Sequence, residues 1–232
     1  MGIVKKIYIV HGWSYFTTKW KELIDLLENK GFKVKLLKVP GLTAQTNKVW
    51  DIDDYVQWLR NKTKREKKFI LLGHSNGGRI SMAFTIKYAK KVSNLILIDS
   101  AGIYHNDLAL RLKRSIFKIL ANTGKKIYYS EKFKNLLYTL ARAKDYKNAK
   151  PVMKQTMINL INSDKDMQIG KISTPTIIIW GQKDSTTPLS DGKLINKLIK
   201  NSSLVVIKGA RHSPQYTNPN QVAEIIFKAI NL

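Results

Sequence analysis

The chain has 232 residues, enough for one domain that buries its own core, or for one domain with an insertion. It contains no cysteine, which excludes disulfide bonds, a thiol nucleophile and metal sites built on thiolates. Lysine and arginine number 41 against 16 aspartate and glutamate residues, for a formal net charge of +25 at pH 7.

This positive charge would attract nucleic acids or anionic membranes without specificity. Only seven of the 41 basic residues are arginine, the side chain that proteins dedicated to reading phosphates or bases favour. The lysines are scattered along the chain, and Ile and Asn are also abundant, as a bias toward AT-rich codons would produce. We therefore expect no specific nucleic-acid partner.

The first residues contain only a short apolar run and lack the small-residue cleavage site of a signal peptide. No stretch approaches the roughly 18 apolar residues that a transmembrane helix needs. We expect a cytoplasmic protein, present as a monomer or a homodimer.

Short apolar runs, most of them rich in β-branched residues, predict buried parallel strands. These runs are residues 7–10, 34–39, 69–73, 95–99, 176–181 and 203–209. Helical patterns lie between them, at residues 19–30, 52–60, 78–90, 192–200 and 220–230. The alternation of strand and helix predicts an α/β protein with a doubly wound, mostly parallel sheet.

One long segment, residues 103–170, interrupts this alternation. It contains no convincing strand and carries helical runs around 107–121, 131–143 and 150–162. We interpret it as a helical lid inserted into a core domain that comprises residues 1–102 and 171–232.

The third predicted strand leads into a turn that reads Gly-His-Ser-Asn-Gly-Gly at residues 73–78. A serine at a tight strand-to-helix turn takes a strained backbone conformation, and small residues two positions before and after it prevent clashes. Gly73 and Gly77 occupy these two positions. Ser75 is therefore a candidate nucleophile, with an ordinary turn serine as the alternative.

A serine nucleophile needs a histidine base at neutral pH, and the base needs a carboxylate that fixes its tautomer. His212 directly follows the last predicted strand, and Asp184 follows the strand before it. Both loops then lie at the carboxyl ends of parallel strands, where open α/β sheets place their sites. Asp99, at the end of the fourth strand, is the alternative acid. We predict Asp184, and expect Asp99 to fix a loop at the mouth of the sheet.

These motifs resemble those of the α/β hydrolases over nearly the whole chain. The closest resemblance is to single-domain esterases and carbon–carbon bond hydrolases that carry a lid. The matching segments are HGW at 11–13, VPG at 39–41, GHSNGG at 73–78, LILIDSAG at 95–102, IIIWGQKD at 177–184 and GARHSP at 209–214.

The resemblance implies that Ser75 is the nucleophile, His212 the base and Asp184 the orienting acid. It also implies an oxyanion hole made by the backbone N–H groups of Trp13 and Asn76, with no cofactor and no metal. Asn76 departs from the family, in which this position is often apolar or Gln. Its side chain could add a polar contact near the acyl group.

Four further side chains are candidates for the substrate pocket: Tyr15, Phe16, Tyr104 and His105. Tyr15 and Phe16 could equally pack against the lid, and His105 could equally lie on the surface. We expect His74 to point away from the site, because adjacent residues in such a turn face opposite ways.

The sequence thus predicts a carboxylesterase-like serine hydrolase that cleaves small to medium carboxylic esters, lactones included, through an acyl-enzyme. A carbon–carbon bond hydrolase with the same triad is one alternative, and a non-catalytic binding protein on the same fold is another. A lipase is disfavoured because no long apolar interfacial helix is evident.

Overall fold

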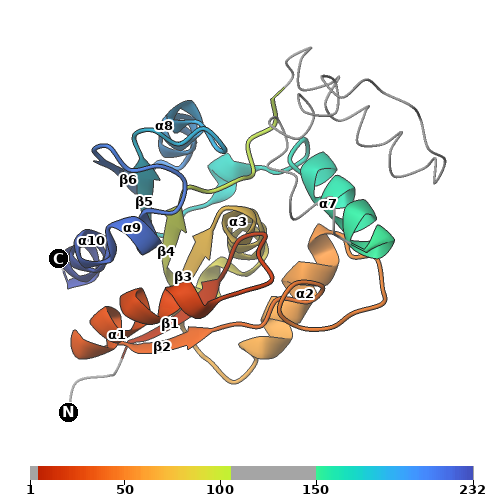
Figure 1. The fold of residues 1–232 in the computed structure, drawn as a ribbon, viewed down its shortest axis with the longest axis horizontal. Coiled ribbons are helices and arrows are strands. Elements are labelled where there is room, and N and C mark those ends of the chain that lie inside the picture. The colour runs from red at the N-terminus through yellow and green to blue at the C-terminus, as the bar shows by residue number, and fades with distance from the viewer. Residues whose placement is uncertain (1–4, 106–149, 232) are drawn as a thin grey trace.

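A six-stranded sheet organises the computed structural model, which describes residues 5–105 and 150–231 (Figure 1). Its strands run parallel in the spatial order β2-β1-β3-β4-β5-β6. They are β1 (Lys6–Val10), β2 (Lys33–Leu36), β3 (Phe69–His74), β4 (Val92–Ile98), β5 (Thr176–Gly181) and β6 (Ser202–Ile207). The predicted parallel α/β sheet is confirmed. The direction of winding reverses between β1 and β3, the position where open α/β sheets form a crevice.

Helices cover both faces of the sheet (Figure 1). One face carries α1 (Lys21–Asn29), α9 (Pro214–Thr217) and α10 (Pro219–Asn231). The other carries α2 (Ile52–Lys62), α3 (Asn76–Tyr88) and α8 (Leu189–Leu198), with α7 (Pro151–Ser163) packed beside α2. Short 3-10 helices are η1 (Thr18–Trp20), η2 (Ala89–Lys91) and η3 (Ile169–Lys171).

The inner strands β1, β3, β4 and β5 are largely apolar because successive side chains enter two different cores, whereas the edge strands β2 and β6 keep exposed residues. Within β3, Phe69 and Leu71 pack into the core under α2 and α3, whereas Ile70 and Leu72 pack under α1 and α10. Every residue of β3 is buried. The nucleophile candidate therefore follows a fully buried strand.

The helix α7 is the described part of the predicted lid. It corresponds to the run expected at 150–162, while the runs expected at 107–121 and 131–143 lie outside the described residues. Thr156 Oγ1 accepts a hydrogen bond from the Trp50 N–H at 3.0 Å, and Asn159 Nδ2 donates to the Trp50 carbonyl at 3.3 Å. These bonds hold α7 against the loop that precedes α2. The division into core and lid stays a prediction.

Within residues 5–105 and 150–231, no helix has both the length and the apolar character that crossing a bilayer requires.

Gly77 provides a test of how closely α3 approaches β1. A Cβ atom at Gly77 would lie 2.0 Å from the Val10 carbonyl oxygen and 2.6 Å from that of His11. We expect Gly77→Ala to lower the free energy of unfolding by about 2–3 kcal/mol or more, because backbone must move to make room.

Gly170→Ala is the matched control, since its Cβ would meet only the Leu198 carbonyl oxygen, at 3.7 Å. This variant should remain within about 1 kcal/mol of the wild type. Urea unfolding measures both, and a Gly77→Ala variant as stable as the wild type would contradict the close approach.

Candidate active site

Ser75 lies at a strained turn between β3 and α3. Its backbone has φ 52° and ψ −120°, a conformation that residues other than glycine rarely adopt. The Ser75 N–H donates to the Ile98 carbonyl at 3.1 Å, and the Ser75 carbonyl accepts from Ala101 N–H at 3.0 Å. These bonds to the end of β4 hold the turn in place, so the predicted strained serine turn is confirmed.

The structure brings Asp184 and His212 together from loops that follow β5 and β6. Nδ1 of His212 lies 2.7 Å from Oδ2 of Asp184. The other carboxylate oxygen accepts the N–H groups of Thr186 at 2.7 Å and Thr187 at 3.2 Å. With Nδ1 directed at Asp184, the His212 ring is oriented by its partner, and Nε2 is left to interact elsewhere.

The Asp184 carboxylate is stabilised in its charged form. Burial acts to raise its pKa, but the hydrogen bonds from His212, Thr186 and Thr187 outweigh burial and hold the pKa below the usual range. The stability that these bonds provide is therefore present at neutral pH. It is lost only as the pH falls through this lowered pKa.

Asp99, the alternative acid, has a different set of partners. Its Oδ1 accepts the Gly181 N–H at 2.8 Å and its Oδ2 accepts the Ser213 N–H at 2.7 Å, whereas Nδ1 of His212 is 4.0 Å away. Burial, with a smaller effect of the neighbouring Asp184 charge, raises the pKa of Asp99 to about 7. Asp99 thus ties the end of β5 to the loop that carries His212, as expected for a loop-fixing residue.

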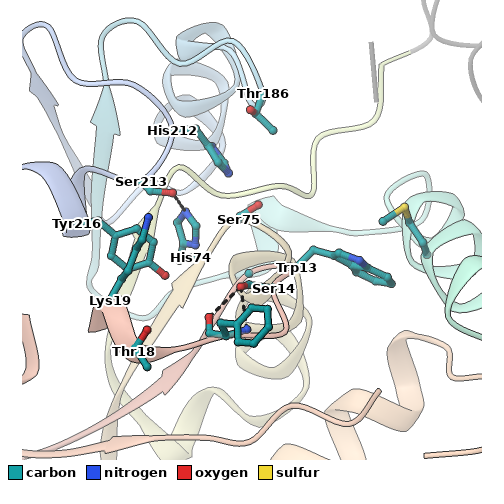
Figure 2. A pocket seen from close by; sticks show the side chains of 13 residues that line it. Trp13, Ser14, Thr18, Lys19, His74, Ser75, Thr186, His212, Ser213 and Tyr216 are labelled. Carbon is teal, nitrogen blue, oxygen red and sulfur yellow. Dashed lines mark hydrogen bonds between the residues drawn. The ribbon is translucent and has the colours of Figure 1, made fainter. Parts of the chain in front are cut away.

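The prediction that His74 points away from the site is wrong. His74 lines the same cavity as Ser75 and His212, instead of pointing away from it (Figure 2). Its Nε2 lies 3.2 Å from Ser213 Oγ, and its ring centroid is 5.0 Å from that of His212. The cavity continues past the end of β3 onto the α1 side of the sheet, and this is the side that His74 faces. Burial first of all, and then the neighbouring His212, lower the pKa of His74, which favours a neutral ring.

The groups predicted to bind the oxyanion are the backbone N–H groups of Trp13 and Asn76. Within the described part of the chain, the backbone N–H groups of Trp13 and Asn76 donate no hydrogen bond. Asn76 is the first residue of α3, where the helix dipole favours negative charge. Trp13 lines the cavity that contains Ser75.

The Asn76 side chain is directed away from the cavity, which corrects the expectation that it lies near the acyl group. Its Oδ1 accepts a hydrogen bond from Nη1 of Arg79 at 2.5 Å. Arg79 in turn donates from Nε to Oδ1 of Asp164 at 2.7 Å and from Nη2 to Oδ2 at 2.9 Å. All three side chains are buried. This chain of contacts joins the residue after Ser75 to the end of α7.

The cavity over Ser75 has a volume of about 500 Å³. Phe16 lines it, and Tyr15 lines an adjacent cavity of about 590 Å³ to which Phe16 also contributes. Tyr104 and His105 are not part of the wall around Ser75. His105 instead places Nε2 2.9 Å from Oδ2 of the buried Asp191 in α8.

One group of described side chains has the spacing of metal ligands. Nitrogen and oxygen atoms of His74, Asp99 and His212 lie within 4.8 Å of one another. Both Asp99 oxygens and Nδ1 of His212 already bond to protein groups, and Nε2 of His74 contacts Ser213. Nδ1 of His74 is the one ring nitrogen of this group that is buried without a hydrogen-bond partner in the described part of the chain.

The chain is similar in sequence to a known protein family and to several known hydrolases. The model of the family described as "Serine aminopeptidase, S33" matches residues 3–216. A pimeloyl-[acyl-carrier protein] methyl ester esterase of Wigglesworthia glossinidia brevipalpis is 26% identical, over 97% of this chain and 93% of its own length. Lipase 1 of Psychrobacter immobilis is 24% identical over 66% of this chain. The chain spans about half the length of that lipase and of lipase 3 from Moraxella.

Solved structures share the fold. The enol-lactonase of Burkholderia xenovorans superposes with a TM-score of 0.75 at 13% identity, over 100% of this chain and 93% of its own. A thermophilic esterase of Thermogutta terrifontis gives a TM-score of 0.71 at 22% identity, over 99% and 90% of the two chains. At this level of identity, these similarities establish the α/β-hydrolase fold.

The Arg79–Asp164 pair should contribute strongly to stability. We expect Asp164→Ala to lower the free energy of unfolding by about 3–5 kcal/mol, because it removes the carboxylate that neutralises the buried Arg79 charge. Urea unfolding of the purified variant measures this loss.

Asp25→Ala is the control, because it breaks the exposed Lys21–Asp25 ion pair on α1. It should cost only about 1 kcal/mol. Equal losses in the two variants would show that the buried Arg79–Asp164 pair contributes no more to the free energy of unfolding than an exposed pair does.

Proposed function

The chain belongs to the family described as serine aminopeptidase, S33, and we propose that it is a serine hydrolase of carboxylic esters, lactones included. The observation that carries the proposal is the 2.7 Å contact between His212 Nδ1 and Asp184, in loops beside the strained turn at Ser75. Ser75 and His212 line one cavity, so that a bound substrate would meet both (Figure 2).

In the first half of the proposed reaction, Ser75 Oγ attacks the carbonyl carbon of the ester, and its proton passes to Nε2 of His212. Asp184 remains ionised and stabilises the imidazolium that forms. The carbonyl oxygen becomes an oxyanion, which the N–H groups of Trp13 and Asn76 would bind. Each such donor is worth about 10²–10³ in rate.

The tetrahedral intermediate then releases its alcohol. The carbon–oxygen bond to the leaving group breaks, and the alcohol takes the proton from His212, which leaves the acyl group on Ser75. Water gives a proton to His212 and attacks the acyl carbon. The bond to Ser75 breaks, Ser75 regains the proton, and a carboxylic acid is released. A lactone would yield one hydroxy acid by the same steps.

Asp184 suits the role of orienting acid better than Asp99 does. Both oxygens of Asp99 accept backbone N–H groups, and its distance to His212 Nδ1 is 4.0 Å against 2.7 Å for Asp184. The pKa of Asp184 is lowered whereas that of Asp99 is raised, so Asp184 is the better stabiliser of a positive imidazolium.

Other reactions fit the cavity less well. An aminopeptidase must recognise the positive α-amino group of its substrate, and among the residues that the structure describes no Asp or Glu lines the cavity over Ser75. A carbon–carbon bond hydrolase stays the alternative. It is favoured by a 25% identical relative from Pseudomonas putida, a 2-hydroxy-6-oxononadienedioate/2-hydroxy-6-oxononatrienedioate hydrolase, matched over 88% of this chain. We also propose that the partner of the chain is a small-molecule ester or lactone. The cytoplasmic location and the oligomeric state remain predictions.

A rate panel tests the proposed function. It comprises nitrophenyl esters from acetyl to decanoyl and a set of lactones, assayed with wild type and with Ser75→Ala, Asp184→Asn and Asp99→Asn. We expect Ser75→Ala to reduce turnover to background. Asp184→Asn should lower kcat by about 10²–10⁴, because the base loses its tautomer and its counter-charge.

Asp99→Asn is the matched carboxylate control, and it should retain more activity than Asp184→Asn. A larger loss at Asp99 would reassign the acid. Full turnover by Ser75→Ala, or none by a folded wild type on any ester or lactone, would overturn the esterase proposal and direct attention to carbon–carbon substrates.

A further inference from the structure

The wall of the cavity over Ser75 has two different chemical characters. Trp13, Phe16 and Met157 supply an apolar part. Thr18, Lys19 and Tyr216 supply a part that carries polar and charged groups. Figure 2 shows Trp13 on one side of Ser75 and the group of Lys19, Thr18 and Tyr216 on the other. A substrate centred on Ser75 would therefore reach apolar surface in one direction and a lysine in the other.

Lys19 is available to a ligand. Its ammonium group has neither an ion-pair nor a hydrogen-bond partner among the residues that the structure describes. Its neighbour Lys21 differs, since its Nζ lies 2.6 Å from Asp25 Oδ2. Among the described residues that line the cavity, none carries a carboxylate that could neutralise Lys19. The positive charge at this wall is thus unopposed within the described part of the chain.

The backbone of Lys19 has a fixed position relative to the site. Lys19 belongs to η1, and the next residue, Trp20, is fully buried. The Trp20 ring packs edge-on against Tyr216 at 5.5 Å and near His74 at 6.1 Å between centroids. Because both partners also line the cavity, the start of the Lys19 side chain is held beside it while the ammonium end remains free to move.

Neutral hydroxyl groups accompany the lysine. The hydroxyls of Thr18 and Thr186 line the cavity, and within the described residues no hydrogen bond from either is present. One ammonium group with neutral donors matches a single negative charge. A phosphate dianion would call for further cations or an arginine fork, whereas Lys19 is the one lysine or arginine among the described residues of this wall.

We propose that the preferred substrate is an ester that carries a carboxylate remote from the scissile bond, and that Lys19 binds this carboxylate. The inference rests on the proposed esterase function and names its substrate class. The apolar wall at Trp13 and Met157 receives the uncharged part of the substrate, and the carboxylate lies against Lys19. The overall charge of +25 adds a long-range attraction for the same anionic molecules.

The test compares monomethyl esters of dicarboxylic acids, from glutarate to azelate, with methyl esters of monocarboxylic acids of equal chain length. Acetyl esters of ω-hydroxy acids, beside acetyl esters of simple alcohols, place the carboxylate on the alcohol half instead. The readout is the selectivity ratio, kcat/KM for the anionic ester divided by kcat/KM for its neutral partner. We expect a ratio above one for at least one anionic series in the wild type.

Lys19→Met keeps the apolar stem and removes the charge, and it should lower this ratio about tenfold through KM. Lys19→Arg should restore most of it. Lys21→Met is the matched control. It removes the same charge two residues further along the chain, from a side chain that is already paired with Asp25, and it should leave the ratio at the wild-type value. Added salt should lower the ratio of the wild type more than that of Lys19→Met.

A wild-type ratio of one or less in both series would overturn the inference, and so would equal ratios in Lys19→Met and the wild type. In either case Ser75-dependent turnover of the neutral esters would leave the proposed function standing. If the folded wild type hydrolysed neither class, the proposed function would fail and this inference with it. An equal loss of ratio in Lys21→Met would attribute the preference to overall charge and also overturn the role of Lys19.

Discussion

The candidate site depends on one constraint, the sharp turn at Ser75 between β3 and α3. The turn requires a positive φ at a residue with a side chain, and it is held by hydrogen bonds to Ile98 and Ala101 at the end of β4. It also requires α3 to approach β1 so closely that no Cβ fits at Gly77. The sheet meets these conditions because β3 is central and buried on both faces, so the strain is balanced by the packing around it.

Asp99 connects this turn with the other two loops of the site. Its carboxylate accepts one N–H at the end of β5 and one from Ser213, the residue after His212. Ser213 has φ 96° and also contacts His74, so the loop after β6 is fixed on two sides. The proposed base is thus positioned by Asp184 through its ring and by Asp99 through its backbone. Two buried carboxylates with opposite pKa shifts divide these tasks.

Much of this could be predicted from the sequence, because local patterns determine it. Apolar β-branched runs indicated the strands, and the glycines around Ser75 indicated the turn. Alternation along β3 places His74 on the α1 side of the sheet, but that the cavity extends to this side depends on tertiary packing. The contact of Asn76 with Arg79 and Asp164 likewise joins segments far apart in the chain. The sequence does not distinguish Lys19 from the other scattered lysines, because its place in the wall of the cavity over Ser75 depends on the fold. Properties that arise from tertiary packing leave no local signal.

Every step of the proposed reaction depends on Ser75 acting as a nucleophile that His212 activates. Reaction with a fluorophosphonate, followed by mass spectrometry of the intact chain and its peptides, tests this most directly and needs no knowledge of the substrate. We expect one adduct per chain, on Ser75, formed far more slowly in His212→Ala because the base that removes the serine proton is missing. A folded protein without an adduct on Ser75, or with the same labelling rate in His212→Ala, would contradict it.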